Sequence, residues 1–195
     1  MNFMYDYHAM LGALALVVGV AGYVPYIRDT LKGSTKPHPF TYGIWAFVGA
    51  ISFVAQILNN AGPGAWVSGI PVLFGIIVAI LSVRKGEPPT KRDLKFLAGA
   101  LAAIVIWRLT DDALYAVLIV IVINVFAVIP TFRKAYGKPD EETALSYSLG
   151  ALRSVISIPA LLSFNAVTLL PPICNIVSNV ALVSMLLIRR KSLRR

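Results

Sequence analysis

Long apolar runs alternate with short polar segments along the chain. The seven runs are Ala9–Ile27, Phe40–Leu58, Ala65–Val83, Leu94–Leu109, Ala113–Phe132, Thr143–Phe164 and Ala166–Ile188. A helix needs roughly 20 largely apolar residues to cross the hydrocarbon layer of a membrane, with about 17 as the lower end. Six runs reach that length, whereas Leu94–Leu109 is shorter and relies on Lys95 and Arg108 at its ends to reach the headgroups. The pattern therefore predicts seven membrane-spanning helices.

Two segments of the chain resemble each other at an offset of 105 positions. Val24–Trp45 aligns with Ile129–Gly150, so that Pro25 meets Pro130 and the two basic loops coincide. In each copy the chain leaves one apolar run, crosses a short basic loop and begins the next run. Internal similarity of this kind indicates a repeated structural unit.

The repeat and the number of runs together predict a topology. Three crossings reverse the direction of the chain, so a fourth crossing brings the second triplet of runs into the same sense as the first. We expect an all-α membrane protein with seven transmembrane helices, arranged as two parallel three-helix bundles joined by a linker helix (3+1+3). Residues 1–88 form the first repeat, 89–110 the linker helix, and 111–195 the second repeat with a basic tail.

Composition and charge agree with a membrane location. The chain is 57% hydrophobic and only 14% charged, whereas about 25% of the residues in a soluble domain are charged. The net charge of +9 is spread over the segments between runs, which favours an anionic lipid surface over nucleic acid as the partner.

The positions of the basic residues predict an orientation. Lys and Arg gather after runs one, three, five and seven, and are absent before run one and after runs two and six. Because cytoplasmic loops of membrane proteins are enriched in Lys and Arg, we expect the N-terminus outside and the C-terminus in the cytoplasm. We assign the chain to the plasma membrane.

The sequence contains no motif for catalysis or for a cofactor. The only cysteine, Cys174, excludes a disulfide framework and a cysteine metal cluster. Neither a phosphate-binding glycine loop nor a nucleophile with an adjacent base is present. We expect the protein to be neither an enzyme nor a carrier of a cofactor or metal.

The layout and several motifs resemble the SWEET and PQ-loop superfamily of membrane transporters. The second copy contains Ile129-Pro130-Thr131-Phe132-Arg133-Lys134, which is close to the P-T-F and basic run that SWEETs carry there. The segment from Pro39-Phe40 to Trp45 is similar to the beginning of their second helix. The similarity in layout covers essentially the whole chain, although the Pro-Gln dipeptide itself is replaced by Pro25-Tyr26 and Pro130-Thr131.

The resemblance implies that prolines act as hinges. SWEETs use prolines in helices one, two, five and six, which match Pro25, Pro39 and Pro130, while the fourth position holds Ala144. A proline inside a helix removes a backbone hydrogen bond and bends the helix, and such breaks in corresponding halves point to a solute pathway. An ordinary packing kink is the alternative. Tyr26 is a further candidate for the gate.

The resemblance also implies a solute site between the two bundles near the membrane midplane. Asn175 follows two prolines, as a substrate-binding asparagine follows a proline in SWEET-like proteins, and Asn179 lies one turn further on the same face. Their amides suit hydroxyl or amino-acid groups, and an interhelical hydrogen bond is the alternative role. The repeat partner of Asn175 is Phe74. Trp45 is expected either to form a stacking wall of the site or to anchor the helix at the interface.

Arg153 places a charge in the middle of an apolar run. It stands ten residues into run six, or about 15 Å at 1.5 Å per residue, near the centre of a layer about 30 Å thick. No Asp or Glu lies inside any run to pair with it. Since an intramembrane charge faces the bundle interior or a wet cavity, we expect Arg153 to contact a bound carboxylate or phosphate, or to hold neighbouring helices by hydrogen bonds.

These observations predict a transporter that moves a small polar metabolite by alternating access. The resemblance favours a sugar, and Arg153 favours an amino acid or another carboxylate. The absence of a carboxylate inside the runs favours facilitated diffusion over proton coupling. A non-transporting receptor or accessory protein, as the KDEL receptor is, remains the alternative from another class. The expected partners are the solute, the lipid bilayer and further copies in a homo-oligomer.

Overall fold

The structure is a computed structural model that describes residues 3–37, 39–85, 112–193 and a few positions between 95 and 110. Within this part of the chain every regular element is helical. The α-helices are α1 (Phe3–Lys32), α2 (Pro39–Leu58), α3 (Trp66–Lys85), α5 (Ala113–Gly137), α6 (Ala144–Ser157) and α7 (Ala166–Leu193), and two short 3₁₀ helices are η1 (Gly62–Ala65) and η2 (Pro139–Glu141). The all-α prediction is therefore confirmed for the described residues.

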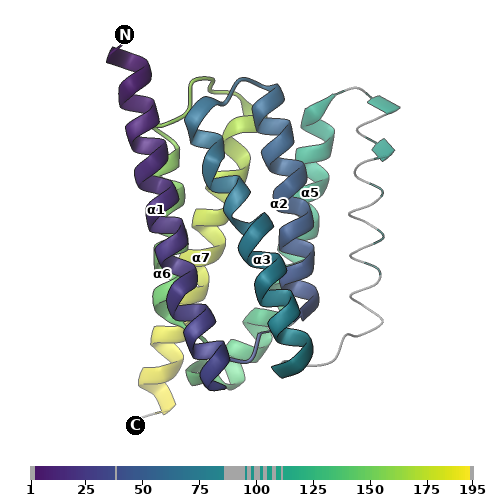
Figure 1. Cartoon of the computed structure of the whole chain (residues 1–195). Coiled ribbons are helices and arrows are strands. Elements are labelled where there is room, and N and C mark those ends of the chain that lie inside the picture. The colour runs from purple at the N-terminus through teal and green to yellow at the C-terminus, as the bar shows by residue number, and fades with distance from the viewer. Residues whose placement is uncertain are drawn as a thin grey trace.

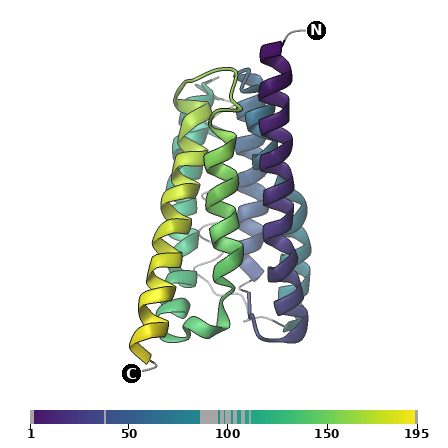
Figure 2. The same ribbon diagram turned by 90° about the vertical axis from the view of Figure 1, so that its left-hand side faces the viewer.

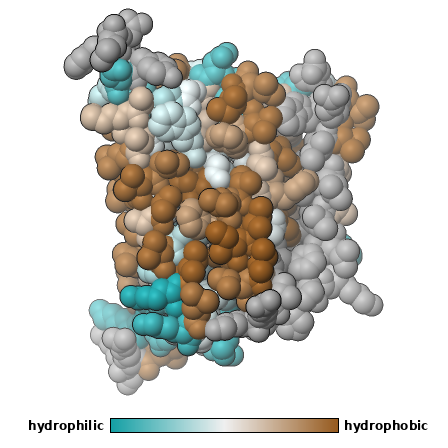
Figure 3. Space-filling view, in the orientation of Figure 1, coloured by the Kyte–Doolittle hydropathy of each residue, from teal (hydrophilic) through white to brown (hydrophobic). Residues whose placement is uncertain are grey.

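Four helical stretches are long and apolar enough to cross a membrane. They are Asp6–Lys32, Gly62–Ser82, Ala113–Gly137 and Ala166–Leu193, and α2 adds a shorter apolar stretch, Tyr42–Leu58. Many large apolar side chains on these helices are exposed, among them Val17, Leu73 and Val122. Figure 3 shows that hydrophobic residues cover the middle of the face in view. An apolar surface of this extent is consistent with an integral membrane protein.

The helices form two triplets that run in the same sense. In the first triplet, α1 descends from the N-terminus, α2 returns and α3 descends again (Figure 1). In the second triplet, α5, α6 and α7 repeat this order and end at the C-terminus. Most of the predicted linker helix, residues 89–110, lies outside the described residues, so the count of seven spans stays a prediction.

The packing inside each triplet follows one pattern. α3 packs against both α1 and α2, and α7 packs against both α5 and α6. The triplets meet where α1 packs on α6 and α2 packs on α5, and Figure 2 shows α6 between α1 and α7. Each first helix thus lies beside the second helix of the other triplet, which is the relation expected of two copies facing each other.

Helix α6 is shorter than its apolar run. The run Thr143–Phe164 predicts a helix through residue 164, but α6 ends at Ser157 and residues 158–165 form turns and loop. Pro159 supplies the reason, because it lacks the N–H that would continue the helix. Pro159 belongs to the apolar run Thr143–Phe164 but lies beyond the end of α6.

The three predicted hinge prolines occupy different helix positions. Pro25 lies inside α1, seven residues before the helix ends at Lys32. α5 runs through residue 130 without interruption, and α2 begins at Pro39, a position where the missing N–H costs no helical hydrogen bond. These positions are compatible with bending near the ends of α1 and α5, and the hinge role itself stays a prediction.

Candidate functional site: a cavity between the two triplets

A cavity of about 150 Å³ lies between the triplets and takes its wall from all six described helices. The wall is largely apolar, with polar groups converging from several helices. The polar and aromatic residues of this wall are Tyr23, Tyr26, Tyr42, Trp45, Ser52, Gln56, Ser68, Asn124, Ser146, Tyr147, Arg153, Ser157, Asn175, Ser178 and Asn179. A concave apolar site with a few polar groups is the usual form of a small-molecule site.

Four of the five predicted binding residues meet in this wall. Trp45, Arg153, Asn175 and Asn179 all line the cavity, although they come from three helices. Phe74 is not part of the wall. Its ring stacks on the ring of Tyr23, with centroids 4.9 Å apart and planes at 19°, so Phe74 supports a wall residue from behind. Solute binding by any of the five stays a prediction.

Asn175, Asn179 and Ser154 are joined by hydrogen bonds. The Nδ2 of Asn179 donates to both the backbone oxygen and Oδ1 of Asn175, at 2.8 Å each. The hydroxyl of Ser154 donates to the same Oδ1 at 3.0 Å. These contacts fix the orientation of the Asn175 amide, whose oxygen is occupied while its Nδ2 makes no hydrogen bond to the described residues.

Arg153 points into the bundle and not toward lipid. Its side chain lines the cavity and the residue is only 7% exposed. Gly19 of α1 makes room for it, because a Cβ at residue 19 would lie 2.9 Å from the Arg153 Cδ. Nε and Nη1 are buried without a hydrogen-bond partner. Among the described lining residues Arg153 is the only one with a charged side chain.

Three tyrosines line the cavity on the side of the base of the bundle, the end at which the C-terminus lies. The ring centroids of Tyr26 and Tyr42 are 5.1 Å apart, and those of Tyr26 and Tyr147 are 6.2 Å apart. All three are at most 6% exposed. Trp45 packs edge-on against Tyr42 at 5.0 Å. The tyrosines bring together α1, α2 and α6, so this layer joins the two triplets.

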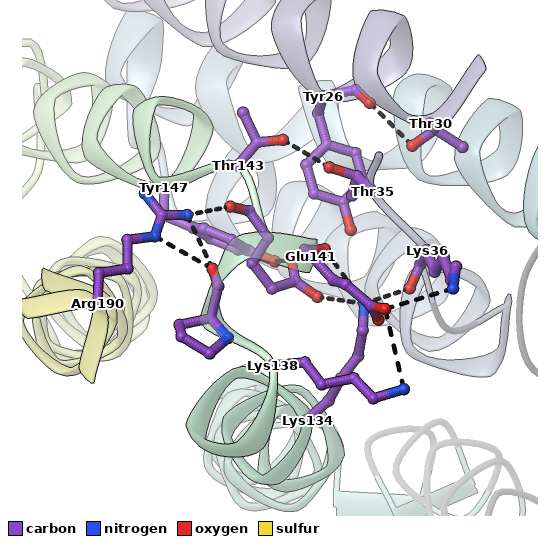
Figure 4. Close-up of polar contacts among 12 residues, drawn as sticks. Tyr26, Thr30, Thr35, Lys36, Lys134, Lys138, Glu141, Thr143, Tyr147 and Arg190 are labelled. Atoms are coloured by element: carbon purple, nitrogen blue, oxygen red, sulfur yellow. Dashed lines mark hydrogen bonds and ion pairs between the residues drawn. The ribbon is translucent and has the colours of Figure 1, made fainter. Parts of the chain in front are cut away.

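A polar cluster lies directly below the tyrosines (Figure 4). The Tyr147 hydroxyl donates to Glu142 Oε2 at 2.8 Å, and Lys134 Nζ donates to Glu142 Oε1 at 2.8 Å. Glu142 lies in the loop before α6 and is only 4% exposed. Burial raises the pKa of its carboxyl group, and the neighbouring Lys134 opposes that rise without cancelling it.

Side chains on both triplets tie this base together. Thr143 donates to Asp29 Oδ2 at 2.9 Å, and its hydroxyl is 2.8 Å from that of Thr35. Lys36 pairs with Glu141 at 3.3 Å, and Lys134 donates to the backbone oxygen of Lys36. We call the residues in these contacts the basal cluster: Asp29, Thr35, Lys36, Lys134, Glu141, Glu142 and Thr143.

Backbone hydrogen bonds join the triplets at the opposite end. Gly64 N donates to Ala160 O at 3.0 Å, and Leu162 N donates to Ala61 O at 3.0 Å. Gly62 has φ of +63°, and a Cβ there would lie 2.4 Å from a methyl carbon of Leu162. Only glycine combines this backbone conformation with so close an approach. We call these two loop segments, 61–64 and 160–162, the distal loops.

Sequence reasoning missed several polar cavity residues, of which the two amides are the largest. Asn124 of α5 lines the wall, and Gln56 of α2 donates from Nε2 to Ser68 Oγ at 2.7 Å. Both are uncharged polar residues inside otherwise apolar runs. A search of every run for such residues would have found them.

Within the described residues no group of three or more His, Cys, Asp or Glu side chains is placed to hold a metal ion.

Comparison with known proteins adds no relative: no family model matches the chain, and neither a curated protein nor a solved structure is significantly similar to it. The SWEET-like interpretation therefore stays a prediction from the sequence.

Proposed function

We propose that this protein is a SWEET-like membrane transporter, with a 3+1+3 arrangement of seven spans, that moves a small polar solute by alternating access. The observation that carries the proposal is the cavity between two triplets of the same sense, together with separate sets of contacts that join the triplets at each end. In transporters built from repeats, the site lies between the repeats and access alternates as one repeat rocks against the other.

The contacts that join the triplets at the base differ from those at the opposite end, so the two ends can open separately. The basal cluster consists mainly of side-chain hydrogen bonds and ion pairs, and the distal loops are joined by two backbone hydrogen bonds and by Leu161, which is 1% exposed. Each set of contacts is small, and a typical hydrogen bond contributes only about 1 kcal/mol net. Either end could open by breaking its own set of contacts while the packing of α1 on α6 and of α2 on α5 holds the triplets together.

We further propose that transport is facilitative and that the base faces the cytoplasm. No Asp or Glu is among the described residues of the cavity wall, so this wall contains no carboxylate to carry a coupled proton. The base carries Lys36, Lys134, Lys138 and Arg190 in its contacts. Enrichment of Lys and Arg is the mark of the cytoplasmic side.

Cys174 offers a direct test, because it is the only cysteine of the chain and lines the cavity. Reconstituted protein would be treated with a small, membrane-impermeant thiol reagent added to one side of the vesicle at a time. Alternating access predicts that Cys174 reacts from either side. Labelling from one side only would contradict transport and would favour a receptor with a pocket open at one membrane face. A Cys174→Ser variant is the control for background labelling.

A further inference from the structure

We propose that the solute is a short monocarboxylate, bound through its carboxylate by Arg153. The inference rests on the proposed function insofar as the cavity is the solute site, and it names the class of solute. It is carried by the charge, the free hydrogen-bonding groups and the volume of the cavity.

The charge of the cavity calls for an anion. Arg153 is 7% exposed, and it has no salt bridge among the described residues. A buried guanidinium without an anionic partner is costly, and pairing with a carboxylate in a low-dielectric site offsets that cost. Because Arg153 is the only charged side chain in the described wall, one negative charge neutralises the site and two would leave it negative.

The fully buried polar atoms of the wall that lack a partner are suited to an acceptor. The buried atoms of the wall without a partner are Trp45 Nε1, Ser146 Oγ, Arg153 Nε and Arg153 Nη1. The nitrogens only donate hydrogen bonds, and the hydroxyl can donate. The Asn175 oxygen already accepts from Ser154 and Asn179. An ionised carboxylate only accepts, so it can satisfy these buried donors.

The volume limits the size of the solute. A cavity of about 150 Å³ in an engineered protein holds one benzene, which has about six heavy atoms, and this cavity has a volume of about 150 Å³. Carboxylates of three or four carbons are of that size. An amino acid would bring an ammonium group, for which the described wall offers no anionic partner. The geometry therefore points to an unaminated acid, such as a hydroxy or keto acid.

The test compares lactate with lactamide, its neutral amide, as ligands of the full-length protein in detergent, by calorimetric titration. Wild-type protein should bind lactate at least about tenfold more tightly than lactamide, because charge-assisted hydrogen bonds contribute about 1.5–3 kcal/mol and 1.4 kcal/mol corresponds to tenfold. Arg153→Gln should weaken lactate binding by about 10- to 100-fold on the same scale and remove the preference for lactate over lactamide. Arg189→Gln, a matched loss of charge at the exposed end of α7, should leave both affinities unchanged.

The comparison of lactate with lactamide on wild-type protein needs no variant, so it tests the inference even if Arg153→Gln does not fold. Trp45→Phe adds a second check, with a smaller loss of lactate affinity because it removes one donor and keeps a ring. Equal affinity for lactate and lactamide, binding of neither, or lactate binding that survives Arg153→Gln would overturn the inference. Binding of glucose in their place would overturn it while leaving transport intact, and lactate binding by a protein whose Cys174 reacts from one side only would overturn transport alone.

Discussion

Glu142 is the last of three consecutive acidic residues, and the sequence alone does not separate it from Asp140 and Glu141. The structure does, because Glu142 is 4% exposed and lies between Lys134 and Tyr147. Burial depends on how the loop packs against both triplets, which a local pattern does not contain. Arg153 is the opposite case: a charge inside an apolar run must be sheltered, so its inward position could be predicted from the sequence.

The raised pKa of Glu142 predicts a specific pH dependence of stability. In the folded protein the carboxyl group holds its proton to higher pH than in the unfolded chain, where the ordinary pKa is 4.5. Its contribution to stability is therefore fully present below pH 4.5 and is lost as the pH rises through the folded-state pKa, with a slope of at most about 1.4 kcal/mol per pH unit.

The measurement is thermal unfolding in detergent across pH, for wild type and for Glu142→Gln. The difference in stability between the two isolates this group, since the other titrating groups are common to both. We expect the wild type to gain stability relative to the variant as the pH is lowered. A difference that does not change with pH would contradict the environment described for Glu142.

Gly62 gives a second prediction at the residue scale. Its φ of +63° costs a residue with a Cβ about 1–2 kcal/mol, and the added methyl group meets Leu162. Gly62→Ala should therefore lower the unfolding temperature measurably in detergent. Gly43→Ala is the matched control, because it lies inside α2 with open space around its Cβ position and should be neutral or slightly stabilising. Equal effects of the two substitutions would refute this account of the distal loops.

At the scale of elements, the apolar runs predicted which segments are helical but not where each helix ends. α1 extends to Lys32, five residues beyond its run, because the basic end of a helix can leave the apolar layer. α6 stops at Ser157 because Pro159 follows. Hydropathy measures the apolar length of a segment, whereas the end of a helix depends on backbone hydrogen bonds. A helix can therefore end after its apolar run, as α1 does, or before it, as α6 does.

The prolines of α1 and α5 should matter for motion more than for folding. We expect Pro25→Ala combined with Pro130→Ala to fold, since alanine favours a helix interior, but to transport poorly because the bends needed at the base are lost. Uptake of the solute into vesicles checks this, with the unfolding temperature as the control for folding. Undiminished uptake by a folded double variant would remove the hinge interpretation.

At the scale of the whole molecule, the sequence repeat predicted that the two triplets run in the same sense, and the described helices do so (Figure 1). The resemblance to SWEETs and the position of Arg153 suggested five binding residues; four of them line the cavity and Phe74 does not, and their role in binding stays a prediction. The alignment placed Phe74 opposite Asn175, but side chains at equivalent positions can differ in rotamer and neighbours, and Phe74 turns to stack on Tyr23. The contacts at the two ends could not be predicted, because they join loops far apart in the chain.

Alternating access is the central claim, and weakening one end of the cavity at a time tests it most directly. Thr143→Val with Lys36→Met removes side-chain contacts of the basal cluster across the triplets. Leu161→Ala loosens the distal loops, where Leu161 packs against Gly64.

The rate of Cys174 labelling would be measured from each side of reconstituted vesicles. The account predicts that the basal variant reacts faster from the side of the base and more slowly from the other side, and that Leu161→Ala shows the reverse. Unchanged rates in both variants, or faster labelling from both sides at once, would contradict it.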